Sequence, residues 1–175
     1  LLLIGMPILS FDFGITGDEL VHKQNGENVL KYLQSGGVDT TYRTYKNLYL
    51  YGALFDGSAA MVYENMPKSD PYTIRHFLNS LFGAGLMIFT GLLARQLSRS
   101  WLVAFLAMLL TVLSPRIFGD SMNNPKDIPF ALAYVMSILG IIRFNSFLPK
   151  WNWKAAIFLG LSMSMALNIR VGGLL

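Results

Sequence analysis

Four apolar stretches constrain this chain more than any other feature of its sequence. They cover about residues 74–94, 101–118, 128–142 and 155–169. Each approaches the roughly 20 mostly apolar residues that a transmembrane helix needs. The last two are the shortest and reach that length only with flanking residues. We therefore predict an all-α fold, a polytopic transmembrane helical bundle.

The composition agrees with a membrane protein. Of 175 residues, 53% are hydrophobic and 14% are charged, whereas a soluble domain has about 25% charged residues. The chain begins at Leu1 without an initiator Met and stops at Leu175 in an apolar stretch, so we expect residues 1–175 to be the N-terminal fragment of one membrane-embedded domain. Residues 1–11 lack the charged start of a signal peptide and indicate the stub of a further span.

The acidic residues are confined to certain segments of the sequence. The loops 95–100 and 143–154 contain five basic residues and no acidic one, which by the positive-inside rule predicts a cytoplasmic location. We expect these loops to be connectors only. Because successive spans cross the membrane in opposite directions, segments 12–73 and 115–127 are expected on the other side. These two segments hold all ten acidic residues. Three tryptophans flank the basic loops, as rings at the headgroup level do: Trp101, Trp151 and Trp153.

The net charge of +4 is explained by this topology. The basic residues are scattered or lie in short loops and form no stripe, so no nucleic-acid partner is expected.

The outer segment 12–73 is too long for a simple turn. Apolar residues at near-helical spacing predict two amphipathic helices in it, over 18–34 and 48–66, lying along the membrane surface. Small residues at 83–85 predict close helix packing.

The first candidate site is the acidic pair Asp18-Glu19 at the start of the first surface helix. Acids at a helix N-terminus are favoured by the helix dipole, so capping explains the pair about as well as catalysis does. Its position directly above a membrane helix favours a general base that faces a lipid-borne substrate.

The second candidate site is the polar outer loop between the second and third complete spans. Lys126 and Arg116 suit a phosphate, and Asp127 with Asn124 suits sugar hydroxyls. Alternatively, the loop is a solvated turn in which Asp127 caps the helix that follows.

Arg75-His76, at the start of the first complete span, is predicted to be an interfacial pair whose side chains reach the headgroups; phosphate contact is the alternative. His22 and His76 are the only histidines and have no ligand spacing, so no metal site is predicted. No cofactor is indicated, and no residue pattern supports a divalent metal. The seven acids other than Asp18, Glu19 and Asp127 are expected on the solvated surface.

In the order of these elements, the chain resembles the N-terminal part of the GT-C membrane glycosyltransferases. The similarity is to the group around protein O-mannosyltransferases and aminoarabinose transferases, glycosyltransferase family 39 or related. It covers essentially the whole chain. Five features carry it: Asp18-Glu19, Tyr51-Gly52-Ala53-Leu54-Phe55, Arg75-His76-Phe77-Leu78-Asn79, Leu113-Ser114-Pro115-Arg116 and Asp127.

This resemblance implies a function and roles for the site residues. It implies transfer of a sugar, with inversion, from a polyprenyl-phosphate donor to a hydroxyl of a lipid, glycan or protein acceptor. Asp18 would be the catalytic base, Glu19 its orienting partner and Asp127 a residue that positions donor or acceptor. Lys126, Arg116 or Arg75 would meet the phosphate. The implied location is the bacterial inner membrane, with the active site facing the periplasm or exterior, and the fragment alone is expected to be inactive.

Two other classes of function remain open at this stage. A transporter or channel predicts ionisable residues at mid-membrane depth, and the central parts of the four apolar stretches contain none. A non-catalytic membrane scaffold is not excluded by the acidic loops. The glycosyltransferase hypothesis makes a geometric prediction: Asp18 and Asp127 should approach each other across one outward-facing cavity.

Overall fold

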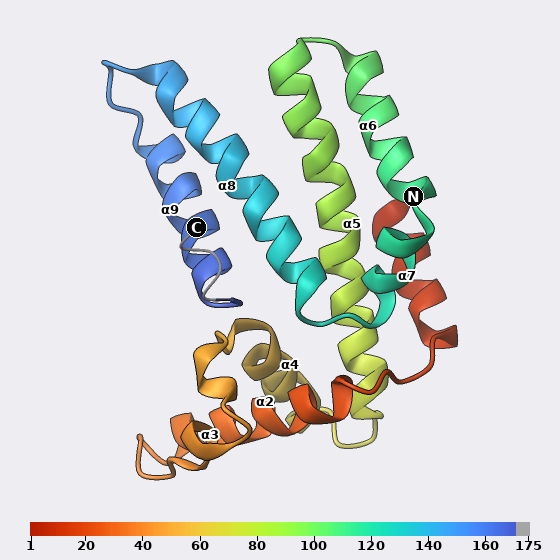
Figure 1. The fold of residues 1–175 in the computed structure, drawn as a ribbon, viewed down its shortest axis with the longest axis vertical. Coiled ribbons are helices and arrows are strands. Elements are labelled where there is room, and N and C mark those ends of the chain that lie inside the picture. The colour runs from red at the N-terminus through yellow and green to blue at the C-terminus, as the bar shows by residue number, and fades with distance from the viewer. Residues whose placement is uncertain (171–175) are drawn as a thin grey trace.

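The computed structural model describes residues 1–170, and every regular element in that range is a helix. Helices α5, α6, α8 and α9 run alongside one another, and α2, α3 and α4 lie across one end of this bundle (Figure 1). The predicted all-α class is confirmed. The elements are α1 (Leu2–Leu9), η1 (Ser10–Asp12), α2 (Glu19–Gln34), α3 (Thr41–Thr44), η2 (Leu48–Leu50), α4 (Leu54–Glu64), α5 (Pro71–Ser98), α6 (Trp101–Leu113), α7 (Pro115–Asn123), α8 (Asp127–Phe147) and α9 (Trp153–Leu167).

Helix α5 is the central element, and α1, α4, α6, α7 and α8 all pack on it. Its start is well defined, because the Asp70 side chain accepts a hydrogen bond from the Thr73 N–H at 2.8 Å and Pro71 occupies the first helical position. The helix ends at Arg99, which adopts a left-handed conformation with φ 58°. It contains the whole predicted span 74–94 and extends it at both ends.

The predicted span 101–118 covers two helices rather than one. The chain bends by 69° between α6 and α7, at Ser114-Pro115. Proline lacks the N–H that would continue the helix, and its ring forces the preceding residue out of the helical region. Ser114 is accordingly extended, with ψ 110°. The bend directs α7 toward the start of α2.

Two of the four predicted spans, α5 and α8, are long and apolar enough to cross a membrane, and the bent pair α6–α7 makes a third if it is one span. Helix α9, over the predicted span 155–169, has 15 residues and is a shorter apolar helix, as is the segment 2–12 at the predicted stub. The apolar residues 172–175 that suggested truncation lie outside the described residues.

The bundle has two chemically different ends (Figure 1). At one end lie α2–α4, α7 and the turn 124–126. We call this the acidic end, because all ten acidic residues belong to segments 12–73 and 115–127. At the other end lie the connections 99–100 and 148–152, and we call it the basic end. The acidic residues therefore lie away from the end formed by the two basic connections, as predicted, whereas basic residues occur at both ends.

The surface-helix prediction is accurate for 18–34, which forms α2, and too long for 48–66, where only Leu54–Glu64 forms α4. Tyr51-Gly52 is not helical because it docks on the end of α9. The Leu54 N–H donates to the Asn168 carbonyl at 3.0 Å, and a side chain at Gly52 would collide with the Asn168 backbone.

Substitution of Gly83 by alanine tests the predicted close packing of the small residues at 83–85. A Cβ at Gly83 would collide with the Ser121 side chain on α7, and overpacking of this kind costs about 1–3 kcal/mol. We expect Gly83→Ala to lower the melting temperature of the full-length protein in detergent. The matched control is Gly160→Ala, because no atom of the described chain lies within 4 Å of the added Cβ. Equal melting temperatures for both variants would contradict the assigned packing.

Candidate active site

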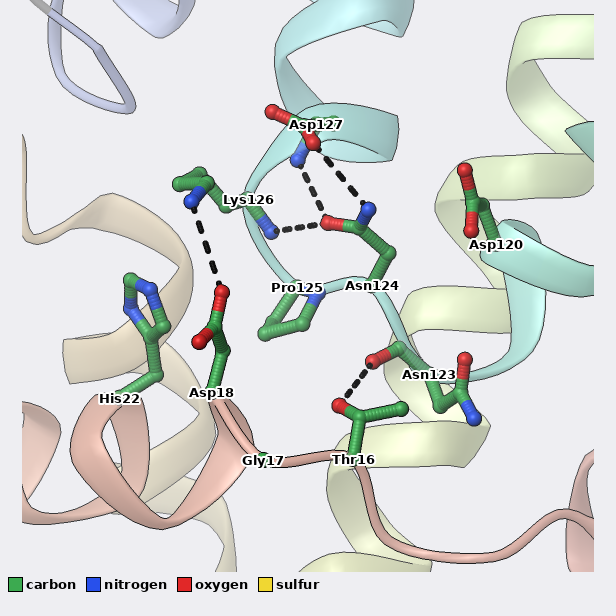
Figure 2. Close-up of a pocket in the computed structure, with 10 residues that line it drawn as sticks. All are labelled: Thr16, Gly17, Asp18, His22, Asp120, Asn123, Asn124, Pro125, Lys126 and Asp127. Atoms are coloured by element: carbon green, nitrogen blue, oxygen red, sulfur yellow. Dashed lines mark hydrogen bonds and ion pairs between the residues drawn. The ribbon is translucent and has the colours of Figure 1, made fainter.

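A polar cavity of about 230 Å³ opens at the acidic end, between the start of α2 and the turn that joins α7 to α8 (Figure 2). Asp18 and Lys126 face each other in it, with 3.8 Å between the carboxylate Oδ2 and the ammonium Nζ. Two segments more than a hundred residues apart therefore form one site. The lining residues are Thr16, Gly17, Asp18, His22, Asp120, Asn123, Asn124, Pro125, Lys126 and Asp127.

Asp18 precedes α2 directly, and its side chain makes no capping hydrogen bond. Glu19 does this work instead: its Oε2 accepts the Thr16 N–H at 2.7 Å, as the acid of a capping box does. The Asp18 side chain is 79% exposed. The capping interpretation therefore applies to Glu19, and the Asp18 carboxylate is available to the cavity.

Glu19 itself does not line the cavity. Only 1% of it is exposed, and its Oε1 lies 2.8 Å from His76 Nε2 on α5. Both carboxylate oxygens are thus engaged, one within the start of α2 and one across to α5. The predicted catalytic pair consists of one exposed acid and one buried acid that fixes its position.

A buried ionic cluster lies beneath the cavity, where α2 and α4 pack on the start of α5. Asp56 is 5% exposed. Its Oδ1 accepts from Arg75 Nη2 at 2.8 Å, and its Oδ2 contacts His22 Nδ1 at 2.8 Å and Asn25 Nδ2 at 3.2 Å. Burial raises the pKa of the Asp56 carboxyl, but the His22 hydrogen bond and the Arg75 charge outweigh burial and hold this pKa below its ordinary value.

This cluster corrects two predictions. Arg75 and His76 are 1% and 3% exposed, so the prediction of a pair reaching the headgroups is wrong. We expected Asp56 on the solvated surface, but it is buried on α4 and binds side chains of two other helices, α2 and α5. The reason is that α2 and α4 cover the beginning of α5, and the sequence pattern of α5 alone does not reveal that cover.

His22 lines the cavity and was missed as a site residue. A signal for it exists in the sequence: it follows Asp18 by four residues, and residues four apart share a helix face. Asp120 was also missed. It lies on α7, which the sequence prediction assigned partly to a membrane span and partly to a loop.

The turn before α8 is held by Asn124. Its Oδ1 accepts the N–H groups of Lys126 and Asp127 at 3.3 and 3.0 Å, and Asp127 is the first residue of α8 and does not cap it. The Asp127 oxygens accept from Asn124 Nδ2 at 3.2 Å and Arg170 Nη1 at 3.0 Å. The Lys126 ammonium lies 5.9 Å from the centre of the Tyr51 ring. These contacts direct Lys126 toward Asp18.

Four of the eight predicted site residues line the cavity and four do not. Asp18, Asn124, Lys126 and Asp127 line it, so Asp18 and Asp127 share one cavity. Glu19, Arg75 and His76 are buried beneath it. The Arg116 side chain is 90% exposed and lies 3.6 Å from Asp120 one helical turn along α7. Within residues 1–170, no three acidic or histidine side chains are placed to hold a metal ion.

Comparison with known proteins supplies one finding. The family model described as dolichyl-phosphate-mannose-protein mannosyltransferase matches residues 45–175. No curated protein and no solved structure matches the chain. The matched residues include α4–α9 and the turn that carries Lys126 and Asp127, whereas Asp18 precedes them.

The buried cluster predicts a large effect of Asp56→Asn on stability. This change keeps the side-chain shape but leaves the Arg75 charge buried without a counter-charge, which costs about 3–5 kcal/mol. We expect a clearly lower melting temperature in detergent. The control is Asp120→Asn, whose partner Arg116 is exposed, and loss of an exposed pair costs about 0–1 kcal/mol.

The difference in stability between wild type and Asp56→Asn should depend on pH, because the pKa of Asp56 is lowered in the folded protein. Its contribution to stability is complete above the ordinary carboxyl pKa and is lost as pH falls through the lowered pKa of the folded state. The difference between wild type and Asp56→Asn should therefore stay constant near neutral pH and narrow only in acid. If the stability difference between wild type and Asp56→Asn narrowed as pH rises toward neutral, that result would contradict the ion pair between Asp56 and Arg75.

Proposed function

The chain belongs to the dolichyl-phosphate-mannose-protein mannosyltransferase family, and from this premise we propose that the cavity at the acidic end is the active site of a membrane glycosyltransferase. The enzyme would transfer a sugar from a polyprenyl-phosphate donor to a hydroxyl of its acceptor, with inversion. The family description names a mannose donor and a protein acceptor, and both are our first choice for this chain. One observation supports the site best: the exposed Asp18 carboxylate faces Lys126 in a polar cavity.

Asp18 is the proposed general base. It accepts the proton of the acceptor hydroxyl as the hydroxyl oxygen forms a bond to the anomeric carbon of the sugar. The bond from that carbon to the phosphate oxygen breaks, and its electron pair leaves with the polyprenyl phosphate. Because attack and departure occur on opposite faces of the carbon, the configuration inverts. The side chain suits this role because no capping hydrogen bond occupies it.

Lys126 is the proposed partner of the departing phosphate. In the structure its ammonium lies 3.8 Å from Asp18, which is too long for a strong hydrogen bond. On donor binding, the flexible lysine stem lets the ammonium exchange Asp18 for a phosphate oxygen. A fixed cation placed where negative charge develops is a large contribution to catalysis in many enzymes.

Asp127 and Asn124 are proposed to position the substrates. The Asp127 side chain is 50% exposed and can accept from a sugar hydroxyl while Arg170 and Asn124 hold it. Glu19, His76, Arg75 and Asp56 act indirectly, since they fix α2 above α5. The exposed Arg116 lies outside the cavity, and we assign it no role in this proposal.

The structure favours chemistry at the surface over transport through the bilayer. The central parts of α5, α6, α8 and α9 carry no ionisable residue, whereas transport pathways are lined by such groups. The basic residues at the opposite end support a cytoplasmic location of that end by the positive-inside rule. We therefore propose that the cavity faces the exterior, as the periplasmic face of a bacterial inner membrane does.

Removal of the proposed base tests the function directly. We expect Asp18→Asn in the full-length protein to lower sugar transfer from labelled polyprenyl-phosphate mannose by about 10²- to 10⁴-fold, the usual contribution of a general base. Asp12→Asn is the control, because Asp12 is an exposed acid at the same end that does not line the cavity. Full activity of Asp18→Asn would exclude Asp18 as the base.

Removal of the proposed phosphate partner gives an independent test. We expect Lys126→Met to lower kcat by about 10²- to 10³-fold, since it removes a charge that acts mainly on the transition state. The melting temperature should change little, because the ion pair with Asp18 is partly exposed. The exposed Lys68→Met is the control. A rise in KM with unchanged kcat would show that Lys126 binds the donor without stabilising the leaving group.

A further inference from the structure

The basic end has a high density of positive charge without counter-charge. Five basic residues lie there, and all ten acidic residues belong to the segments at the acidic end. Within residues 1–170, the ion pairs involve other bases only. The sequence predicted mere connectors here. The five residues are Arg95, Arg99, Arg143, Lys150 and Lys154.

Two adjoining cavities of about 500 and 340 Å³ separate the hairpin α5–α6 from the hairpin α8–α9 at this end. Gln96 and Arg143 line both of them. Lys154 lines the larger cavity, and Arg95 and Arg99 line the smaller one. Figure 1 shows the two hairpins diverging toward this end. Four of the five cations therefore border a space and are not spread over a convex surface.

The two central guanidinium groups are held by aromatic rings. The Arg95 guanidinium carbon lies 4.9 Å from the centre of the Trp101 ring, and that of Arg143 lies 5.9 Å from the centre of the Phe158 ring. Such cation–π contacts orient a guanidinium but leave its N–H donors unused. Arg95 Nε is buried and has no hydrogen-bond acceptor in the structure. A buried donor without an acceptor is unfavourable, and an anion that accepts from it would remove this cost.

We propose that the basic end binds the phosphate headgroup of an anionic phospholipid between Arg95 and Arg143, with Arg99 and Lys154 at the rim. Guanidinium groups bind phosphate oxygens with paired N–H donors. Basic pockets between membrane helices bind anionic headgroups in the same manner. The binding site is remote from the cavity at the acidic end and does not depend on the proposed reaction.

The surroundings favour a lipid over free phosphate. Trp101 and Trp151 lie at this end and are 68% and 74% exposed, as rings at the headgroup level are. The neighbouring faces of α6 and α9 expose apolar side chains, among them Leu102 and Ile157. A phospholipid can place its acyl chains on these faces while its phosphate enters the cavity. Free phosphate uses none of this apolar surface.

The experiment measures lipid binding to the full-length protein in detergent by native mass spectrometry. The probes are phosphatidylglycerol and phosphatidylcholine with identical acyl chains. We expect wild type to prefer phosphatidylglycerol by at least about tenfold, with the preference falling as salt rises. The double variant Arg95→Gln and Arg143→Gln should lose this preference. The matched control, Lys31→Gln with Lys68→Gln, removes two exposed charges at the acidic end and should retain it.

Three outcomes would overturn the proposal: equal binding of the two lipids by wild type, a preference that survives in the double variant, and a preference independent of salt. A parallel thermal-shift series with inorganic phosphate distinguishes the source of the phosphate. Stabilisation by inorganic phosphate without any lipid preference would exclude a lipid site and indicate a site for free phosphate. Because wild type alone supplies the lipid comparison and the salt series, the result does not depend on the folding of the double variant.

Discussion

The buried charge of Arg75 determines how the acidic end is built. A guanidinium that is 1% exposed is unfavourable by several kcal/mol unless a carboxylate accompanies it. Asp56 on α4 supplies that carboxylate, and the same carboxylate binds His22 on α2. Three helices thereby meet at one ion pair. His22 lies four residues after Asp18, so the position of the proposed base above the turn 124–126 depends on a contact that no substrate touches.

The second ionic link, between Glu19 and His76, joins the first residue of α2 to α5. With the Asp56 cluster it gives α2 two anchors on α5, and α5 is also the helix on which α7 and α8 pack. Both segments that line the cavity are consequently held in place by one helix, α5. An active site that joins distant parts of a chain requires such a common support, because catalytic distances tolerate errors of well under 1 Å.

The two ends of the bundle differ in their charged residues, because the acidic residues are absent from the connections at the basic end. The acidic end concentrates carboxylates, amides and one facing lysine in a polar cavity, which suits chemistry on a lipid-borne sugar. The basic end concentrates guanidinium groups beside exposed tryptophans. A headgroup bound there would fix the depth of the bundle in the membrane. The depth of the cavity relative to a donor held in the same bilayer would be fixed with it.

Prediction from the sequence succeeded where local pattern decides the outcome. The helix at 18–34 was correctly placed because amphipathic periodicity and a glycine stop are local signals. The span 101–118 was predicted as one stretch because its hydropathy continues through Ser114, but the helix bends there at Pro115. Arg75 and His76 were predicted to reach the headgroups because their position at a span boundary is visible in the sequence. The helices that cover them come from elsewhere in the chain.

The sequence by itself determined the helical membrane class, the confinement of the acidic residues to one end and the two segments that line the polar cavity. These follow from hydropathy and charge order, which act over a few residues. Only the tertiary structure decided that Asp18 faces the cavity while Glu19 is buried, and that Asp56 is a core residue. Burial of a polar side chain depends on which distant helix covers it, and a buried charge selects its partner by distance and desolvation rather than by position along the chain.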